Sequence, residues 1–253
     1  TESILRKYKD ELAAVILEPC WRDNPPDPTY LKALREVTES LGILLIFDEV
    51  ISFRVSPGGA QKLYGVTPDI TTMGKIIGGG FPVGAYASTD EVMKPLIIPE
   101  ATFPIVKASK LSFSGTFNAH PVTMAAGLAT MKQLQPNVYE KMNEAGQLMR
   151  DGLGTILDEA GVIAQVGGVG SFFNLAWTKE KIINYRAAAT EDRILGRYLS
   201  LSLMNKGVFL LGHSNISAVA TKEDEDKALE AMRQSVEELK PIINERAPHL
   251  LRG

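Results

Sequence analysis

Blocks of apolar residues alternate with amphipathic segments over the first fifty positions of the chain. Residues 12–17 (LAAVIL) and residues 43–47 (ILLIF) are short, continuous apolar runs. Between them, leucine and valine recur at helical spacing over residues 28–40, and Asp27 and Gly42 are suitable caps for that segment. The pattern predicts a buried strand, a helix and a second buried strand. This order is a βαβ unit, so the sheet is expected to be parallel with a right-handed crossover.

The next segment predicts two more strands joined by a glycine-rich bend. Residues 70–73 (ITTM) have β character, residues 78–80 are three consecutive glycines, and residues 83–87 (VGAYA) have β character again. Residues 89–91 (TDE) are typical of a helix start, because acidic groups are favourable in the first turn. Residues 99–112 show no periodicity and are expected to form an irregular loop.

The second half of the chain has a different pattern. Residues 121–133 predict an Ala- and Met-rich helix, and residues 137–160 place apolar side chains on one face of a longer helix. Short β-prone segments and helices follow: strands at 162–166, 171–176, 208–211 and 215–219, and helices at 193–206 and 222–245. Strand pairs interleaved with helices indicate a smaller α+β domain. We therefore predict an α/β domain over residues 1–136 and a small C-terminal domain over residues 137–253, with the boundary near Pro136.

Composition narrows the class of protein. With 253 residues, 45% hydrophobic and 23% charged, the chain is long enough for one large or two smaller globular domains. A net charge of −3 gives no reason to expect nucleic acid or an anionic membrane as a partner, and no apolar run approaches the ~20 residues that span a bilayer. The single cysteine, Cys20, fits a reducing compartment, so we expect a cytoplasmic protein. Three scattered histidines show no metal-ligand spacing.

The first residues of the chain have the pattern of a domain interior and not of a protein start. Thr1 is not an initiator methionine, and the segment that follows lacks the pattern of a signal peptide. Its order, a helix end followed by an apolar strand, is that of a domain interior. We expect that further residues precede this sequence.

Two charged residues at predicted strand ends indicate chemistry. Asp48 ends the apolar run 43–47, and Lys75 stands between residues 70–73 and the three glycines. An enzyme that uses pyridoxal 5'-phosphate (PLP) needs a lysine amine to form a Schiff base and a carboxylate for the pyridine nitrogen. A lysine in this setting is expected to be desolvated, which makes its amine a usable nucleophile. The alternatives are a solvated lysine and a carboxylate that caps the next element.

Three further positions could belong to such a site. Glu18 ends the first predicted strand at the edge where open α/β sheets bind ligands. Val50 could pack on a cofactor ring or fill the core. Thr116 precedes a predicted helix, where it could bind phosphate or cap the helix. The sequence leaves these alternatives open.

Five segments together resemble the class III aminotransferases of PLP fold type I. They are AAVILEP, LLIFDEVISFR, YGVTPDITTMGKIIGGGFPVGAYA, GTFNAHPVTMAAGLATM and TKEDEDKALEAM, and they extend along essentially the whole chain. Within the family, the sequence is most similar to the branch of β-amino-acid transaminases and glutamate-1-semialdehyde aminomutases. The resemblance implies part of a large cofactor-binding domain, with a mainly parallel sheet flanked by helices, and a smaller α+β C-terminal domain.

The same resemblance implies a role for each candidate residue. Lys75 would form the Schiff base and Asp48 would hold the pyridine nitrogen. Val50 would lie against the ring, and Glu18 would stand at the edge of the active site. Thr116 would contact the cofactor phosphate in a partner subunit, which implies a homodimer.

The sequence also departs from the family pattern. Ile51 replaces a glutamine that many members place near the cofactor, and Ala119 and His120 stand where Gly-Asn is common. Members of the family have an extensive N-terminal part that carries a phosphate cup and a stacking aromatic residue, and this sequence lacks that part.

Three functions follow from these observations. The first is transamination between an amino acid, possibly a β-amino acid, and an oxo acid. The second is an intramolecular amino shift of the glutamate-1-semialdehyde 2,1-aminomutase type. The third is a catalytically incomplete fragment or a non-enzymatic module that keeps the fold alone.

Overall fold

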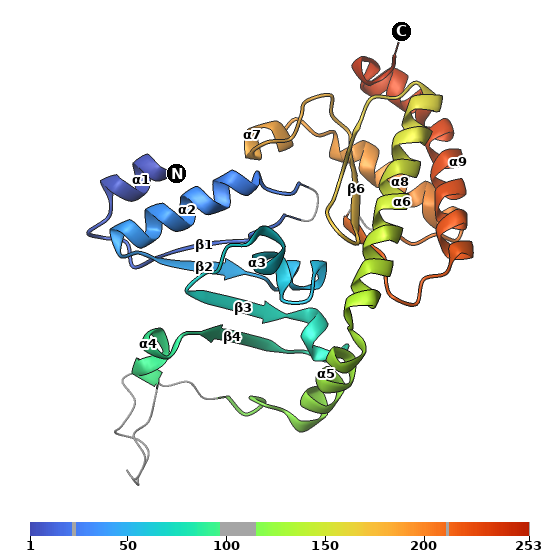
Figure 1. The fold of residues 1–253 in the computed structure, drawn as a ribbon. Coiled ribbons are helices and arrows are strands. Elements are labelled where there is room, and N and C mark those ends of the chain that lie inside the picture. The colour runs from blue at the N-terminus through green and yellow to red at the C-terminus, as the bar shows by residue number, and fades with distance from the viewer. Residues whose placement is uncertain (22–23, 97–114, 211–212, 253) are drawn as a thin grey trace. The chain divides into compact units, whose positions relative to one another are not determined.

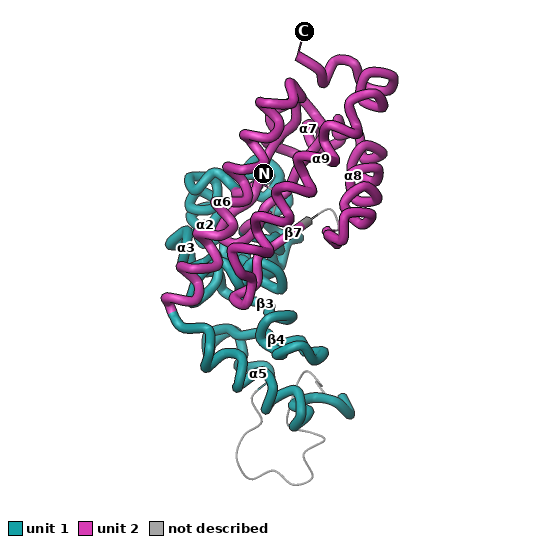
Figure 2. The backbone as a smooth tube through the Cα atoms, turned by 90° about the vertical axis from the view of Figure 1, so that its right-hand side faces the viewer, with its two compact units in different colours: residues 1–19, 26–135 teal, residues 20–25, 136–253 magenta. Residues whose placement is uncertain are grey.

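The computed structural model describes residues 1–21, 24–96, 115–210 and 213–252 (Figure 1). Backbone contacts divide the chain into two compact units (Figure 2). Unit 1 comprises Thr1–Pro19 and Pro26–Gln135, and unit 2 comprises Cys20–Pro25 and Pro136–Gly253. None of the helices in the described ranges is long and apolar enough to cross a membrane.

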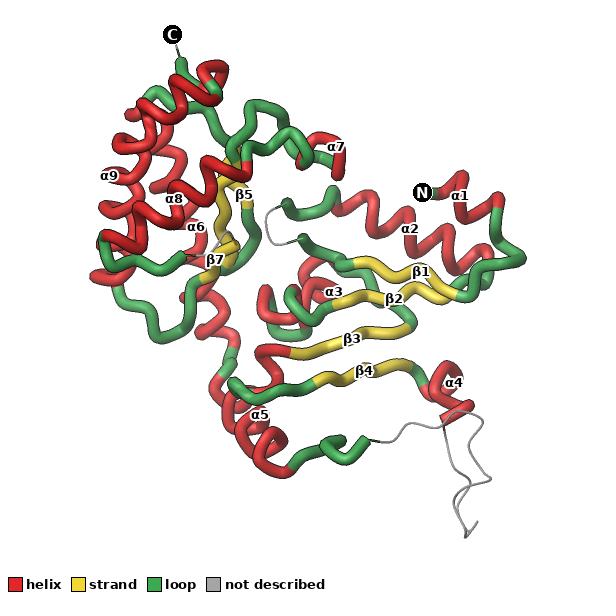
Figure 3. Tube along the Cα trace, turned by 180° about the vertical axis from the view of Figure 1, so that it is seen from behind, coloured by secondary structure: helices red, strands yellow, loops and turns green. Residues whose placement is uncertain are grey.

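Unit 1 contains a four-stranded sheet of order β1-β2-β3-β4 (Figure 3). The strands are β1 (Ala14–Leu17), β2 (Leu44–Asp48), β3 (Ile70–Gly74) and β4 (Gly84–Ser88). The first three are parallel, which confirms the predicted βαβ unit. β4 is antiparallel to β3, because the short glycine-rich connection turns the chain straight back beside the strand it has just left.

Helix α2 (Pro28–Leu41) is the predicted crossover between β1 and β2, and its caps explain its length. The side chain of Asp27 accepts the N–H of Thr29 at 2.8 Å, and Gly42 ends the helix with a φ of 67°. The apolar face of α2 packs with α1 (Glu2–Lys7) and the strands into a core made of Leu5, Leu31, Leu34, Ile43, Leu45, Phe47 and Val66. The helix predicted from apolar spacing is therefore confirmed.

Strand β1 is less buried than its sequence predicts. Val15 and Leu17 pack against the core of unit 1, but the side chain of Ile16 is 62% exposed. Successive side chains of a strand point to opposite faces of the sheet, so Ile16 lies on the face away from that core. An apolar run therefore did not guarantee burial on both faces.

The remaining elements of unit 1 are short, with one exception. They are η1 (Ser52–Val55), α3 (Gly59–Tyr64), η2 (Lys75–Gly78), α4 (Asp90–Met93), η3 (Lys94–Leu96) and the longer α5 (Pro121–Gln133). The predicted helix start at residues 89–91 is confirmed, because the Thr89 side chain caps α4. The loop predicted at residues 99–112 lies outside the described residues.

Unit 2 is an α+β arrangement. Three helices, α6 (Pro136–Ala160), α8 (Arg193–Asn205) and α9 (Lys222–Arg246), accompany an antiparallel sheet of β5 (Gln165–Gly167), β6 (Phe172–Ala176) and β7 (His213–Asn215). The short α7 (Tyr185–Ala188) and η5 (Pro248–Leu250) complete the unit. Its core includes Met149, Leu153, Trp177, Leu195, Val236 and Ile243.

Two predicted strands of unit 2 are wrong in their bounds. Residues 208–210 are not a strand, because the N–H of Val208 donates to the carbonyl of Leu203 and completes the end of α8. The second strand, β7, ends at Asn215, and the residues after it turn towards α9 with a hydrogen bond from the Ala220 N–H to the Ser217 carbonyl. Closure of α8 thus uses the N–H of Val208, which the β-prone sequence assigned to a sheet.

Helix α9 begins at Lys222, as predicted, and its capping box is an additional finding. The Thr221 hydroxyl accepts the N–H of Asp224, and the Asp224 carboxylate accepts the N–H of Thr221 at 2.9 Å. The hydrogen bonds from the Thr221 backbone and side chain hold the pKa of Asp224 below its ordinary value. Two helix-end donors are thereby satisfied reciprocally.

Candidate cofactor site

The carboxyl ends of the parallel strands bring three of the predicted site residues to one edge of the unit 1 sheet. Glu18 directly follows β1, Asp48 is the last residue of β2, and Lys75 directly follows β3. Glu18 and Asp48 are neighbours in register, because Leu17 pairs with Phe47. Open α/β sheets bind their ligands at this edge.

The Asp48 carboxylate is held by two hydrogen bonds to a single oxygen. Its Oδ1 accepts the N–H of Val50 at 3.1 Å and the hydroxyl of Thr72 at 3.1 Å. Thr72 is also the register partner of Asp48 on β3, and its carbonyl accepts the N–H of Glu49 at 2.9 Å. The half-buried carboxylate is therefore fixed against the strand that leads into Lys75.

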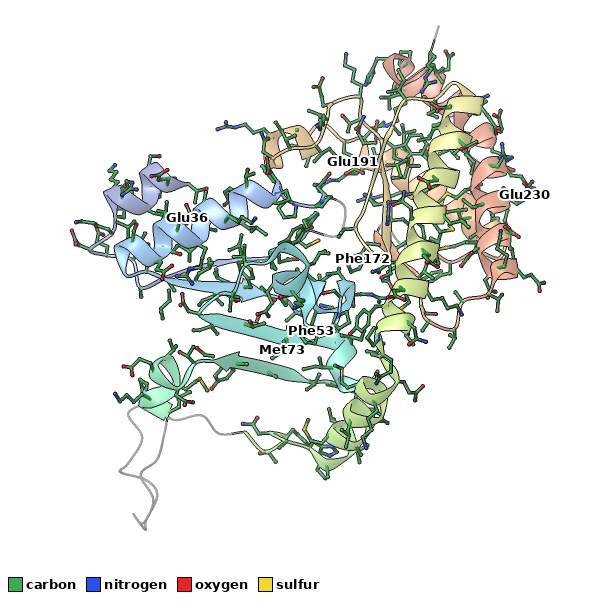
Figure 4. All side chains as sticks on the ribbon, viewed as in Figure 1. Glu36, Phe53, Met73, Phe172, Glu191 and Glu230 are labelled. Atoms are coloured by element: carbon green, nitrogen blue, oxygen red, sulfur yellow. The ribbon has the colours of Figure 1, made fainter. Side chains whose placement is uncertain are left out.

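Lys75 occupies an unusual backbone position. Its φ of 49° lies in the left-handed region, which a residue with a Cβ rarely adopts. Such strain persists only where the surrounding structure enforces it, and it is common at functional sites. Figure 4 labels Met73, two residues earlier, near the end of β3.

The desolvation predicted for Lys75 is not observed, because its side chain is exposed. The nucleophile predicted from sequence thus stands in solvent in this chain.

Val50 lies beside the backbone that precedes Lys75. A Cβ built on Gly74 would come 3.4 Å from Cγ1 of Val50, an ordinary van der Waals approach. The half-buried Val50 side chain therefore borders the turn between β3 and η2. Asp48, Val50 and Lys75 belong to one local structure.

The turn that follows Lys75 packs closely on helix α5. A Cβ at Gly127 would lie well inside 3.0 Å of the carbonyl oxygen of Ile77, and one at Gly79 would lie equally close to the carbonyl of Ala126. Gly79 also has a φ of 58°. The two glycines allow backbones to approach at a distance that no side chain permits.

Thr116 is not brought to the other candidates by any contact among the described residues of this chain. It is exposed, in the turn of residues 115–119 that precedes α5. His120 occupies the N-cap position of α5 without a side-chain bond, so the alternative role of Thr116 as helix cap is wrong. In the same turn, Ala119 has a φ of 52°, a left-handed conformation that glycine adopts more readily than alanine.

Sequence reasoning missed Glu49, which is fully buried. Its carboxylate accepts the hydroxyl of Ser52 at 2.9 Å, the N–H of Ala60 at 2.6 Å and the N–H of Gln61 at 3.0 Å. A Cβ on Gly59 would lie 2.5 Å from Glu49 Oε2, so that position is kept clear for the carboxylate. The signal available in the sequence was an acid directly after a buried strand, next to Asp48.

Comparison with known proteins identifies the family to which this chain belongs. The sequence profile described as aminotransferase class-III matches residues 1–236. The chain belongs to the class-III aminotransferase family. A curated relative, glutamate-1-semialdehyde 2,1-aminomutase 2 of Brevibacillus brevis, is 39% identical over 239 residues, which cover 90% of this chain and 53% of the relative.

Solved structures share the fold of this class-III aminotransferase chain. An omega-transaminase from Sphaerobacter thermophilus is 38% identical with a TM-score of 0.85 over 93% of this chain and 54% of its own. A β-phenylalanine aminotransferase from Variovorax paradoxus is 30% identical with a TM-score of 0.85, and the match covers 100% of this chain and 56% of that structure's chain. A transaminase solved with PLP bound is 31% identical with a TM-score of 0.81, and the match covers 95% of this chain and 55% of that structure's chain.

These similarities confirm the predicted family and its α/β fold of PLP fold type I. The class-III aminotransferase chain spans 53–56% of the length of the relatives named above.

Proposed function

We propose that the protein binds PLP at the carboxyl edge of β2 and β3 and transfers an amino group between an amino acid and an oxo acid. The observation that carries this proposal is the register of the two strands. Asp48 pairs with Thr72, three residues before Lys75, so the carboxylate and the amine stand on adjacent strands at the ligand-binding edge. A solved relative with PLP bound supports the choice of cofactor.

The residues of this edge fit PLP. Asp48 is an ionisable carboxylate with one oxygen engaged by protein donors and a second oxygen that no described residue hydrogen-bonds. Lys75 is an exposed primary amine, and Val50 is an apolar side chain beside it. When bound, PLP supplies the electron sink that makes the α-hydrogen of an amino acid acidic.

Lys75 would act twice in the reaction. Its Nζ would first hold the cofactor covalently through the aldehyde carbon. Once released by the substrate amine, the same Nζ would accept a proton from one carbon and deliver it to another. Asp48 would keep the pyridine nitrogen protonated, and Val50 would limit movement of the ring. Glu18 would border the substrate side of the site.

The substrate is proposed from the relatives. The β-phenylalanine aminotransferase supports an amino donor that includes β-amino acids, with an oxo acid as acceptor. The Brevibacillus relative supports the second candidate, a 2,1-aminomutase. An added amino acceptor distinguishes them, because a transaminase requires it for turnover and an aminomutase does not.

A homodimer is part of the proposal. Helix α5 and the turn before it expose Phe117, Val122, Met124 and Leu128, with exposed fractions from 44% to 78%. An apolar cluster of this kind is typical of a subunit interface. Thr116 lies at its margin, where it could reach a phosphate held by the partner subunit. The single buried Cys20 is consistent with a cytoplasmic enzyme.

The third candidate is a chain that keeps the fold without the chemistry. Its support is the solvent exposure of Lys75. Under this alternative the chain would not form a specific covalent bond with PLP.

The experiment incubates the chain with PLP, reduces it with borohydride and locates the pyridoxyl group by mass spectrometry. We expect modification of Lys75, loss of that modification in Lys75→Ala, and no change in Lys62→Ala, which removes another exposed lysine of unit 1. Modification spread evenly over surface lysines would reject the proposed function for this chain.

A further inference from the structure

Asp48 has one oxygen occupied and one available. Both hydrogen bonds to its carboxylate, from the Val50 N–H and the Thr72 hydroxyl, reach Oδ1. Among the described residues, none donates a hydrogen bond to Oδ2. A carboxylate held through one oxygen cannot rotate freely, so its other oxygen has a defined position.

The hydroxyl of Thr72 is suited to this task. An ionised carboxylate can only accept hydrogen bonds, so the single proton of the hydroxyl is donated to Asp48. Threonine is β-branched and stiff at χ1, which fixes the hydroxyl relative to the strand. The strand register also fixes the backbone of Thr72 relative to Asp48, because the two residues are paired and the Thr72 carbonyl accepts the N–H of Glu49.

Thr72 also connects the two proposed cofactor anchors. It lies on β3, which ends at Gly74 immediately before Lys75. The side-chain bond to Asp48 therefore ties the carboxylate of β2 to the strand that carries the lysine. A change in the relative position of the two strands would break this bond and move the two anchors relative to one another.

We propose that Thr72 is a positioning residue for Asp48, holding Oδ1 so that Oδ2 is the oxygen presented to the pyridine nitrogen; this inference rests on the proposed function. It assigns to Thr72 a role through Asp48 alone, without contact with substrate. Loss of the hydroxyl leaves the charge of Asp48 in place but removes the one side-chain hydrogen bond of the two that orient it, so that only the Val50 N–H still holds Oδ1.

Four variants separate this role from a general structural one. Thr72→Val removes the hydroxyl at nearly constant shape, and Thr72→Ser restores it. Thr71→Val is the matched control, because Thr71 is the preceding residue on the same strand and its buried hydroxyl accepts a bond from the Gln61 side chain instead. Asp48→Asn serves as the reference for a site without the carboxylate charge.

Two measurements decide the proposal. In the chain without cofactor, three-bond couplings report the χ1 rotamer of Asp48. We expect a single rotamer in the wild type, Thr72→Ser and Thr71→Val, and averaged couplings in Thr72→Val. With PLP labelled with ¹⁵N at the pyridine nitrogen, we expect the signal of Thr72→Val to move from the wild-type value towards that of Asp48→Asn, and its affinity for PLP to fall about three- to tenfold.

An Asp48 rotamer that is unchanged in Thr72→Val would overturn the proposal, as would a ¹⁵N shift that moves equally in Thr71→Val. The measurement without cofactor keeps the two hypotheses apart. If the wild type forms no specific bond with PLP, the proposed function fails, whereas the couplings of Asp48 still test whether Thr72 positions the carboxylate.

Discussion

The α-carbon of Gly127 faces the carbonyl oxygen of Ile77 so closely that a Cβ at position 127 would lie well inside 3.0 Å of that oxygen. Ile77 belongs to η2, the turn that begins with Lys75, and Gly127 lies in the middle of α5. The position of the proposed catalytic lysine thus depends on a glycine fifty-two residues away in sequence.

Gly127→Ala is expected to push α5 away from η2, because the obstacle is backbone and not the flexible end of a side chain. Overpacking of this kind costs about 1–3 kcal/mol of unfolding free energy. Denaturant titration measures it, and PLP labelling of Lys75 should decrease in parallel. The control is Gly154→Ala in α6, where a Cβ meets nothing within 4 Å. That variant should be neutral or slightly stabilising, because alanine favours helix. Equal effects of the two substitutions would contradict the proposed packing role.

Glu49→Gln is expected to destabilise unit 1 by about 1–3 kcal/mol. The buried carboxylate accepts four hydrogen bonds, from the Ser52 hydroxyl, the Ala60 and Gln61 N–H groups and the Gln61 side-chain amide. A glutamine at position 49 would direct its own N–H₂ towards some of these donors. Chemical unfolding measures the loss. Glu36→Gln makes the same chemical change on the exposed face of α2 and should alter stability by less than about 0.5 kcal/mol (Figure 4). A fully stable Glu49→Gln would show that the carboxylate charge is dispensable there.

Ala119→Gly is expected to stabilise the protein by about 0.5–1 kcal/mol. Alanine pays about 1–2 kcal/mol to adopt a left-handed conformation, and glycine avoids that cost while losing more chain entropy on folding. The unfolding midpoint should therefore rise. Ala87→Gly, in strand β4 where φ is not positive, should lower it, because glycine weakens a strand. A decrease in both variants would argue against strain at position 119.

Asp224→Ala should destabilise α9 in a pH-dependent manner. The bonds from Thr221 lower the folded-state pKa of Asp224 below its ordinary value. A lowered pKa means that the stabilisation is present above the unfolded-state pKa, about 3.9, and is lost as the pH falls through the folded value. The unfolding midpoints of the two proteins should differ at pH 7. The difference should shrink as the pH falls below about 3.9 and vanish below the folded-state pKa of Asp224. Glu245→Ala, an exposed acid at the other end of α9, should show no such convergence. A difference that persists at low pH would mean that the charge of Asp224 is not what stabilises the cap.

Local sequence features predicted most of the elements well. Helix α2 was predicted with its caps at Asp27 and Gly42, because capping depends on a few neighbouring residues. The start of α9 at Lys222 was likewise predicted, whereas its capping box was not. Two strand predictions failed among the described residues. At residues 208–210 the Val208 N–H completes the end of α8, and β7 ends at Asn215, after which the chain turns at Ser217.

The candidate site could be predicted only in outline. The order of strands and the parallel βαβ rule were enough to expect Asp48 and Lys75 at one edge, and their roles stay predictions. The bond from Thr72 to Asp48 could not be foreseen, because it depends on a register that a shift of one residue would destroy. The exposure of Lys75 was also not predicted, because the local sequence does not determine which distant residues pack over a turn.

The sequence by itself determined the family, the βαβ order and the residue types that PLP chemistry requires, since these depend on motifs and on apolar periodicity along the chain. Only the tertiary structure decided that Glu49 is buried, that Ile16 is not, and that Gly127 supports the turn of Lys75. Each of these facts depends on contacts between segments distant in sequence, and packing geometry between such segments is not encoded in any local pattern.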